Sequence, residues 1–490
     1  MKRKRLMLFA IAAISLSLAY QSRGEEDADN PPPVPAQEQP EVLTKGPVHE
    51  AFASPVNLKD SDGITVKVQP PANIQEVPPA DRPAGEQFTW VSGYWSWDTD
   101  HNGFIWISGC WRAAPPKMSW VPGYWARTEI GWKWVAGFWL QTGVKEIEYV
   151  KEPPAIFDME PSLQAPGSDL VWVPSCWYWS NGQYVLRSGY WLQGQPGWIW
   201  SPSHYLWTPH GYVFSEGHWD YPLERRGVLF APVCFPRNFR VQPGFSYPLS
   251  IVVDIGLLKV NLFTCPRYSH YYFGDYYDDI YMRVGIYPRF EGGRRYSCYD
   301  PVFEHDKWRG RLQDPRWEDH ERRDYELRRD NRELRPSVTY REQESRISKL
   351  QELQRKKVQV AQPISTVVHE KKTPQKFERM DADVQRKISK QGNDLQQYRE
   401  ERKSWESKPG NTIKPGKEPV ERADPAAPAN AGRNPASPSP ERIKVPASPI
   451  AGWQAPGNTG EVLPANPAGE RGGRNDDRGV SRDRGVPDRR

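Results

Sequence analysis

The chain has 490 residues, and its 66 Lys and Arg against 61 Asp and Glu leave a formal net charge of only +5. A charge this small gives little reason to expect a nucleic acid as a partner, and we expect none. Forty-nine prolines and a mean hydropathy of −0.78 indicate that much of the chain does not fold compactly, whereas residues 86 to 300 are apolar and aromatic enough to form one sizeable core.

The first 24 residues have the layout of a secretory signal peptide. Basic residues at positions 2–5 precede an uncharged run at 6–19, and small and polar residues follow. The run is shorter than the roughly twenty residues that cross a bilayer. We predict a signal peptide over 1–24 and export to the periplasm, the cell envelope or the extracellular space, with an uncleaved signal anchor as the alternative.

Residues 25–85 are rich in proline and acidic residues, and they are too polar to bury a core of their own. We predict a mostly disordered linker, with a short edge strand at residues 64–68.

A repeat with the pattern Trp-x-x-Gly-aromatic-Trp follows. Its eight copies, the last four of them weaker, start at Trp90, Trp106, Trp120, Trp134, Trp172, Leu186, Trp200 and Phe214. The starts are 16, 14 and 14 residues apart, then 38, then 14, 14 and 14, which makes two groups of four around an insertion at 140–171. Eighteen of the 22 tryptophans lie in residues 90–219. This spacing indicates a repeat domain over 86–222.

The copies have the pattern of antiparallel strands. Each carries an apolar or aromatic residue two positions before its first large residue, which is the period-two alternation of a strand with one apolar face. Turn-forming residues separate the copies. Asn181-Gly182 is the strongest hairpin signal, because both residues tolerate the positive φ of a type I′ turn.

The two tryptophans of a copy are five residues apart and would point to opposite faces of a regular strand. A bulge at the glycine, which accepts a positive φ, would realign them. We predict one strand bent at each glycine, with Trp90, Trp95 and Trp97 on one face and their counterparts stacked across the strands. The fold class is then mainly β, an antiparallel β-meander of about eight strands, open or barrel-like, with two four-stranded sheets as the alternative.

The units Trp-Val-Pro-Gly-Tyr-Trp at 120–125 and Trp-Val-Ala-Gly-Phe-Trp at 134–139 resemble the YXWGXW or WXXGXW (BcpO-related) repeats of exported bacterial proteins. Segments 46–52 and 270–277 extend the resemblance to repeat proteins of planctomycete-type bacteria. The resemblance implies no assigned chemistry and no catalytic residues. The last two copies depart from the pattern at Trp and Gly, which leaves the number of strands open.

The chain after the repeats divides into three parts. Residues 223–302 predict a tyrosine-rich β elaboration with short strands at 250–256 and 257–263, and residues 408–490 predict a disordered tail. Between them, residues 303–407 predict long charged α-helices that resemble coiled coils.

Start and stop signals place three helices in this charged region. The first lies between Asp314-Pro315 and Pro336, the second runs from a capping box at Thr339 to about residue 358, and the third covers 373–404. The helices at 339–358 and 373–404 are the candidates for self-association.

Two pairs of residues occupy the same position of the repeat, the slot directly before its last aromatic residue. His204 and His218 could align two imidazoles for a metal, but aromatic residues fill this slot in other copies, and we predict neither a metal nor a cofactor. For Cys110 and Cys176, a disulfide and two buried thiols are the alternatives.

Catalytic signatures are absent from the sequence. Asp275, Asp278 and Asp279 could hold calcium, but their spacing favours a polar turn. No Gly-x-Ser-x-Gly, HExxH or phosphate-cradling Gly-Lys motif occurs. We therefore predict a non-catalytic protein.

Two functions remain open. In the first, the chain is a structural or interaction protein of the envelope or surface whose aromatic residues form its core. In the second, it binds carbohydrate, exopolysaccharide or cell wall through exposed tryptophans. The partner is accordingly an envelope protein or a polysaccharide, and side-chain exposure separates the two functions. The candidate platform consists of Trp90, Trp95, Trp97, Trp106, Trp111, Trp120, Trp125, Trp134, Trp139, Trp172, Trp177 and Trp191.

Overall fold

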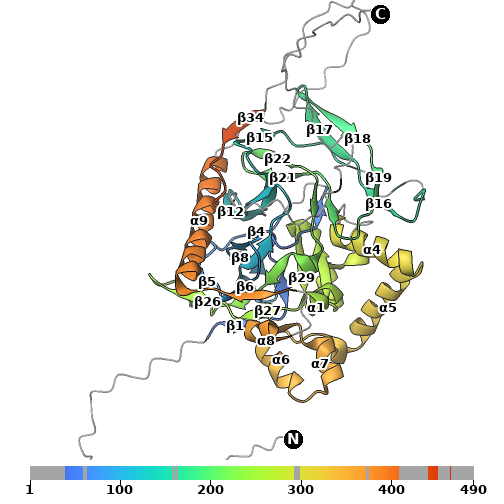
Figure 1. Cartoon of the computed structure of the whole chain (residues 1–490). Coiled ribbons are helices and arrows are strands. Elements are labelled where there is room, and N and C mark those ends of the chain that lie inside the picture. Colours follow the sequence, from blue (N-terminus) through green and yellow to red (C-terminus); the bar gives the residue numbers. More distant parts are fainter. Residues whose placement is uncertain are drawn as a thin grey trace, which may run out of the picture. The chain divides into compact units, whose positions relative to one another are not determined.

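The computed structural model describes residues 39–58, 63–156, 161, 164–291, 298–370, 375–407, 440–450 and 464 (Figure 1). The predicted signal peptide lies outside these residues, as does most of the tail that we predicted to be disordered. One part of that tail forms β34 (Glu441–Lys444), which pairs with β15 (Glu146–Val150) of the insertion. The disorder prediction is wrong for this short strand, in which Ile443 pairs with Ile147.

The repeats form bent hairpins, and each hairpin contains two copies. In the first, β7 (Phe88–Val91) pairs with β10 (Cys110–Ala113), and β8 (Tyr94–Asp98) pairs with β9 (Gly103–Ile107). The chain bends where β7 passes into β8 and where β9 passes into β10. Each copy therefore contributes two strands, and in this hairpin each strand carries one motif tryptophan.

The other copies repeat this arrangement. The second hairpin consists of β11 (Met118–Val121), β12 (Tyr124–Thr128), β13 (Gly131–Val135) and β14 (Phe138–Gln141). The third consists of β16 (Leu170–Val173), β17 (Cys176–Ser180), β18 (Gln183–Arg187) and β19 (Tyr190–Gln193). The fourth consists of β20 (Ile199–Ser201), β21 (His204–Thr208), β22 (Gly211–Ser215) and β23 (His218–Asp220).

The predicted stacking of tryptophans across strands is confirmed. Trp90 faces Trp111 with ring centroids 5.3 Å apart, and Trp95 faces Trp106 at 5.2 Å, both edge to face. Such pairs stabilise a sheet beyond the area they bury. The turn prediction is also confirmed, because Asn181 and Gly182 both have positive φ, 50° and 79°, between β17 and β18.

The predicted meander is wrong, as is its alternative of two four-stranded sheets. No ladder among the described strands joins one hairpin to the next. Strands from outside the repeats pair with them instead. Thus β24 (Gly227–Leu229) pairs with β10, β25 (Val233–Cys234) with β9, β4 (Thr65–Val66) with β13, and β15 with β22. The bend in each hairpin limits a ladder to five residue pairs, and other segments complete the sheets.

The predicted linker is folded over residues 39–58 and 63–85, which corrects the prediction of disorder there. It contains β1 (Glu41–Val42), β2 (Gly46–Pro47), β3 (Val56–Asn57), β4, β5 (Gln75–Val77) and β6 (Asp81–Pro83). The strands are short, so its prolines are tolerated at sheet edges. Val48, Phe52 and Ile74 are fully buried, and the repeats supply the core that this polar segment could not form alone. The predicted edge strand at 64–68 is confirmed as β4.

The tyrosine-rich segment contains both β and helical elements. Its elements are β24, β25, β26 (Ser246–Pro248), β27 (Ile251–Val253), α1 (Ile255–Val260), β28 (Leu262–Cys265), β29 (His270–Phe273), α2 (Asp279–Arg283), β30 (Tyr287–Pro288) and β31 (Cys298–Tyr299), with short 3-10 turns between some of them. The strand predicted at 257–263 is wrong in its first half, because Asp254 accepts a hydrogen bond from the Leu257 amide and starts α1.

The charged region is helical but lies against the rest of the chain. Its helices are α4 (Pro301–Gln313), α5 (Trp317–Asp330), α6 (Tyr340–Ile347), α7 (Glu352–Val358), α8 (Ile364–His369) and α9 (Ala382–Glu406), with β32 (Ala361–Pro363) and β33 (Phe377–Arg379) between them. The capping box at Thr339 is confirmed. The second predicted helix is split into α6 and α7, and the third begins at Ala382 rather than 373.

Helix α9 packs on the first two hairpins, next to β5, β7 and β12 (Figure 1). Its buried residues include Leu395, Tyr398, Arg399, Arg402 and Glu406. The apolar face that suggested a coiled coil is therefore occupied by the chain's own repeats. In contrast, β16 to β19 lie at the edge of the fold in Figure 1, beside α4.

Candidate functional site

The bend of the first hairpin is built around one buried carboxylate. Glu76, from β5, accepts hydrogen bonds from the amides of Gly93 (2.9 Å) and Gly109 (2.8 Å) and from Nε1 of Trp106 (2.7 Å). Burial raises the pKa of Glu76 to about 7, while the three donors and Arg399 act in the opposite direction. The two glycine amides of a repeat pair thus form one donor site, which binds a carboxylate.

The second hairpin uses the same device with a different glutamate. The carboxylate of Glu50 accepts hydrogen bonds from the amides of Gly123 (3.0 Å) and Gly137 (3.1 Å). In the fourth hairpin Ser203 stands at the first glycine position, and its hydroxyl accepts the hydrogen bond from the amide of Gly217 (2.8 Å).

The motif glycines are needed for close approach, not for a positive φ as we predicted. Gly93, Gly109, Gly123 and Gly137 are outside the set of residues with positive φ. A Cβ on Gly109 would lie 2.5 Å from Trp90 Cζ2 and 2.6 Å from both Glu76 Oε2 and the Val91 carbonyl oxygen. The first tryptophan of one copy therefore rests on the glycine of the partner copy, which explains why the motif requires both residues.

Helix α9 closes these two bends from outside the repeats. Arg399 donates to the carbonyl oxygen of Gly93 (3.1 Å), and Arg402 donates to those of Pro122 (3.0 Å) and Ala136 (2.9 Å). Arg402 is also paired with Glu406 at 3.0 Å, and both side chains are fully buried. Helix α9 consequently covers the bends of the first two hairpins.

Sequence analysis missed Glu50, Glu76, Arg399 and Arg402. The two glutamates lie in a segment that we assigned to a linker, and the two arginines lie in a helix that we took as a candidate for self-association. Isolated charged residues carry no periodicity, so the only available signal was the inclusion of Glu50 in the segment 46–52 of the family resemblance.

The predicted tryptophan platform is wrong for the first two hairpins. Its eight motif tryptophans, Trp90, Trp95, Trp106, Trp111, Trp120, Trp125, Trp134 and Trp139, are at most 8% exposed. Trp97 is half-buried against Phe104, at 5.3 Å. These rings form the core because strands from outside the repeats (β4, β24 and β25) and helix α9 pack on the hairpins.

The third hairpin is different, because its rings are half-buried. The half-buried rings are those of Trp172, Trp177 and Trp191, together with Trp179 and Tyr184 near the turn. Val185 and Leu186, also on β18, are 49% and 47% exposed. Contiguous exposed apolar patches mark interaction sites, so these side chains make the third hairpin the candidate interaction surface.

An aromatic cleft lies next to this hairpin. It has a volume of about 80 Å³ and is lined by parts of the second, third and fourth hairpins, including Trp134, Trp177, Tyr205 and Trp207. The ammonium group of Lys133 lies 3.7 Å from the centroid of the Trp207 ring, within the range of a cation–π contact. The cleft therefore combines aromatic surface with polar groups, as ligand sites do.

The histidine pair considered for a metal lines a second, smaller cavity of about 40 Å³. Nδ1 of His204 donates to the carbonyl oxygen of Pro202 (3.0 Å), and Nδ1 of His218 donates to that of Glu216 (3.1 Å). Burial lowers the pKa of His204 to about 4. Asp220, on the same wall, is bound by Arg112 and Arg226 at 2.6 and 2.9 Å.

Across the described part of the chain, no group of three or more His, Cys, Asp or Glu is arranged to hold a metal ion. In the same ranges, no helix is long and apolar enough to span a bilayer. No disulfide joins Cys110 and Cys176, and burial raises the pKa of the Cys110 thiol.

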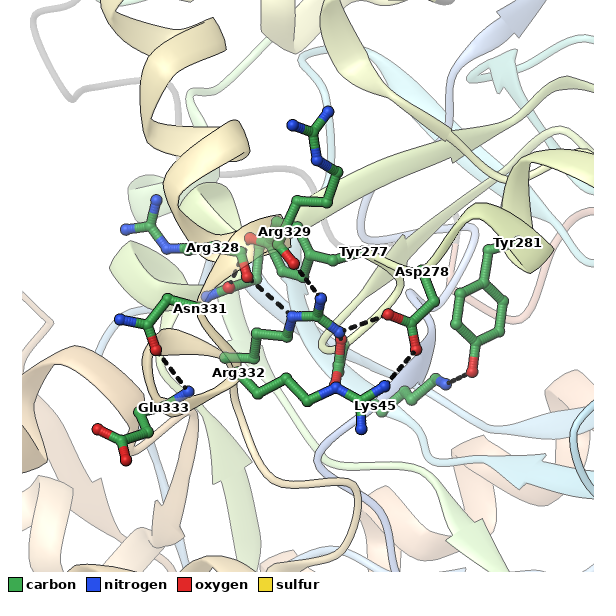
Figure 2. Close-up of polar contacts among 12 residues, drawn as sticks. Lys45, Tyr277, Asp278, Tyr281, Arg328, Arg329, Asn331, Arg332 and Glu333 are labelled. Atoms are coloured by element: carbon green, nitrogen blue, oxygen red, sulfur yellow. Dashed lines mark hydrogen bonds and ion pairs between the residues drawn. The ribbon is translucent and has the colours of Figure 1, made fainter.

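Two of the three acidic residues considered for calcium, Asp275 and Asp278, are bound by arginines. Figure 2 shows Asp278 next to the loop after α5. Arg335 lies 2.8 Å from Asp278 and 3.4 Å from Asp275, and Arg332 lies 3.6 Å from Asp278. Arg335 also donates to the carbonyl oxygen of Arg328 at the end of α5 (2.8 Å). These contacts fasten α5 to the tyrosine-rich segment, which is a structural role.

Nearby, Lys45 joins the N-terminal segment to the same region. Its ammonium group lies 2.6 Å from Asp100 and 2.5 Å from the Tyr281 hydroxyl, the latter contact visible in Figure 2. It also lies 4.2 Å from the ring centroids of Tyr276 and Tyr281. These contacts hold the buried ammonium group between the first hairpin and the tyrosine-rich segment.

Comparison with known proteins supports the division into hairpins. Residues 118–139, 167–191 and 196–219 match the family model described as WXXGXW repeat (2 copies). Each match falls on one hairpin, so the two copies of the model correspond to the two arms of a bent hairpin. Comparisons with curated proteins and with solved structures gave no match. The chain is a WXXGXW-repeat-containing protein in which one pair of repeats makes one hairpin.

Proposed function

We propose that this chain is a non-catalytic protein, exported to the cell envelope or surface, that acts through interactions. The first two hairpins serve as its scaffold, and the third hairpin presents the surface that meets a partner. The observation that carries this proposal is the contrast in burial. The motif rings of the first two hairpins are enclosed around Glu50, Glu76 and α9, whereas those of the third are half-buried.

Export is proposed from the basic and apolar pattern of residues 1–24 and from the resemblance to BcpO-related repeat proteins of planctomycete-type bacteria. Cell fractionation of a producing bacterium tests it. We expect the protein in the periplasm, envelope or medium, with an N-terminus beyond residue 19. A cytoplasmic protein that retains residue 1 would contradict export.

A second candidate function is polysaccharide binding. The half-buried rings of Trp172, Trp177, Trp179, Tyr184 and Trp191 favour it. Aromatic rings offer flat apolar faces at little cost in conformational entropy, and such faces match the C–H faces of sugar rings. The proposed platform is thus confined to the third hairpin.

A retention assay tests this function. The chain from residue 25 onward is passed over peptidoglycan, cellulose and exopolysaccharide, and the double variant Trp179→Ala/Tyr184→Ala is compared with wild type. The two rings form one edge-to-face pair, 4.8 Å apart. We expect the double variant to lose retention on the polymer that holds wild type.

The matched control is Trp132→Ala, which removes a half-buried ring near the turn of the second hairpin. We expect this variant to be retained like wild type. Equal retention of the double variant and wild type would exclude the third hairpin as the contact surface. Absence of wild-type retention on all three polymers would reject polysaccharide binding and leave an envelope protein as the partner.

A further inference from the structure

Strand β18 lacks a neighbour on its outer edge within the described chain, unlike its equivalents in the other hairpins. Strands β9, β13 and β22 each pair on that edge with an antiparallel strand from outside the repeats, respectively β25, β4 and β15. Among the described strands, β18 pairs with β17 alone, and the two lie at the edge of the fold in Figure 1. The third hairpin is therefore the one whose ladders gain no covering strand from the described residues.

The open edge presents the backbone groups of two residues. Because the turn between β17 and β18 has two residues, the N–H and C=O groups of Val185 face β17, whereas those of Tyr184 and Leu186 face outward. Within the described chain, no hydrogen bond joins these outward groups to another residue. At the position of Leu186 in the second hairpin, the amide of Trp134 donates to the carbonyl oxygen of Ile64 (3.3 Å). The edge of β18 thus has the donors and acceptors that a further strand would use.

The side chains of β18 are exposed where their equivalents are buried. Val185 and Leu186 are 49% and 47% exposed. At the same positions of β9, which β25 covers, Ile105 and Trp106 are fully buried. Edge strands of native proteins are usually charged, very short or covered, and an exposed apolar edge is a template for another strand. Strand β18 has the character of a strand that pairs with another chain.

We propose that the occupant of this edge is β18 of a second copy of the chain, in an antiparallel pair centred on Val185. A two-fold axis at Val185 places Tyr184 opposite the partner's Leu186. These are the residues with outward backbone groups, so each such pair exchanges two N–H···O bonds. The two ladders then form one four-stranded sheet, which is the size that β21, β22, β15 and β34 reach within the chain. A closed two-fold dimer is also the commonest symmetric assembly.

The side chains and charges fit this arrangement. Gln183 lies opposite the partner's Arg187, so no like charges meet. Val185 lies opposite the partner's Val185 in a pair without hydrogen bonds, where side chains approach most closely. Side chains that are half exposed in one copy are thereby covered in both.

The pair of Tyr184 with the partner's Leu186 also repeats a pairing found within the chain. At the position of Tyr184 in the second hairpin, Trp132 lies opposite Val66 of β4. In the fourth hairpin, Tyr212 lies opposite Val150 of β15. An aromatic residue of the repeat therefore meets an aliphatic residue of the covering strand in each case, and β18 itself carries both kinds of residue.

This inference deepens the proposed function and rests on it, because it names a second copy as the partner that the third hairpin meets. A strand of five residues offers a small contact area for a protein interface. We therefore expect a weak dimer that forms as the protein concentration rises.

Sedimentation of the chain from residue 25 onward, at increasing concentration, tests this dimer with two variants, Val185→Lys and Val185→Glu. Because Val185 is half exposed, either charge is tolerated within one copy. On the two-fold axis each variant meets its own charge, and we expect each to weaken dimerisation about tenfold. An equal mixture of the two variants places an ammonium group opposite a carboxylate and should restore dimerisation to within about threefold of wild type.

Ile130→Lys is the matched control, because Ile130 is an aliphatic residue, 75% exposed, at the turn of the second hairpin. We expect it to dimerise like wild type, which separates the effect at β18 from a general effect of surface charge. Melting curves of all variants verify that they fold.

Three results would overturn the inference. They are a wild-type chain that stays monomeric at every concentration, a dimer that Val185→Lys and Val185→Glu leave unchanged, and a mixture that dimerises no better than either variant. The proposed function is tested separately by retention on polymers. Equal retention of Trp179→Ala/Tyr184→Ala and wild type, with the dimer present, would reject polysaccharide binding here and keep the inference. Equal retention together with a monomeric wild type would reject the third hairpin as an interaction surface altogether.

Discussion

At the scale of the residue, the motif is explained by contacts across the hairpin. Trp90 lies over Gly109, and Trp134 lies over Gly123, where an added Cβ would be 2.5 Å from the ring in each case. The amides of these glycines donate hydrogen bonds to a carboxylate, that of Glu76 or Glu50. A tryptophan, a glycine and an acidic residue from another segment thus form one unit, and replacing any one of them disturbs the other two.

Buried histidines make the stability of this fold depend on pH. His49 is 1% exposed, and Nε2 donates to the carbonyl oxygen of Ser92 (3.2 Å) while Nδ1 accepts from the amide of Ala51 (3.1 Å). Burial lowers its pKa to about 3. In the unfolded chain the imidazole binds a proton near pH 6.5, so its contribution is complete above that pH and is lost as the pH falls.

We predict that His49→Gln reduces the loss of stability on acidification. From pH 7 to pH 5, this single group should remove about 2 kcal/mol from the free energy of unfolding of wild type. Glu76 acts in the opposite direction, because its pKa is raised to about 7 and its contribution decreases as the pH rises above 4.5. Urea unfolding at both pH values measures the difference.

The control for this prediction is His320→Gln on α5, an exposed position. Its dependence on pH should match wild type. If His49→Gln shows the full wild-type loss between pH 7 and pH 5, His49 is not a buried neutral group and the prediction fails.

At the scale of the element, a bent hairpin depends on a residue that it does not contain. Glu76 is the acceptor for two glycine amides and one indole, and these donors come from both arms of the first hairpin. A carboxylate has enough lone pairs for all three donors. Strand β5, which carries Glu76, therefore fixes the bend, although β5 pairs with no strand of the first hairpin.

We predict that Glu76→Gln loosens the first hairpin. The amide NH₂ of glutamine cannot accept a hydrogen bond, so at least one donor is left buried and unpaired, at a cost of about 1–3 kcal/mol. Hydrogen exchange of the Gly93 and Gly109 amides should become faster. The amides of Gly123 and Gly137, which Glu50 holds, should exchange as in wild type and serve as the internal control.

Glu146→Gln, at an exposed position on β15, is the external control and should change neither stability nor exchange. Equal acceleration at all four glycines would indicate global destabilisation and would contradict the local role of Glu76.

The sequence predicted the elements better than their assembly. Repeat spacing and the Asn181-Gly182 turn identify strands and their pairing within a hairpin, because these are local signals. They do not show which strands extend each hairpin into a sheet. Strands β4, β24 and β25 come from segments outside the repeats, and their pairing with the hairpins is non-local. The site was predicted only in part: of the candidate platform, Trp97, Trp172, Trp177 and Trp191 are half-buried and the other tryptophans are buried, because burial depends on what covers a strand.

At the scale of the whole molecule, the C-terminal helix joins the repeats into one structure. Arg402 reaches back 280 positions along the chain to the carbonyl oxygen of Pro122 and 266 to that of Ala136. Glu406 accepts hydrogen bonds from the hydroxyls of Tyr124 (2.8 Å) and Tyr149 (2.9 Å). One helical turn therefore connects the second hairpin with the insertion that follows it.

This arrangement predicts that removing the single charge of Arg402 lowers the stability of the protein strongly. Arg402→Met should destabilise the protein by about 3–5 kcal/mol, because it leaves Glu406 buried without its cation and two carbonyl oxygens without a donor. Urea unfolding followed by tryptophan fluorescence and by helical circular dichroism measures it. In wild type we expect both signals to change together, since α9 and the hairpins share these contacts.

Two further variants are the controls for the Arg402→Met prediction. Lys356→Met breaks an exposed pair with Glu352 on α7, whose side chains are 64% and 79% exposed, and should cost less than about 1 kcal/mol. Arg402→Met/Glu406→Gln removes the unpaired charge and should recover part of the stability lost in Arg402→Met. If Arg402→Met costs no more than Lys356→Met, or if helix and tryptophan signals already separate in wild type, α9 is an appendage rather than the element that holds the first two hairpins in place.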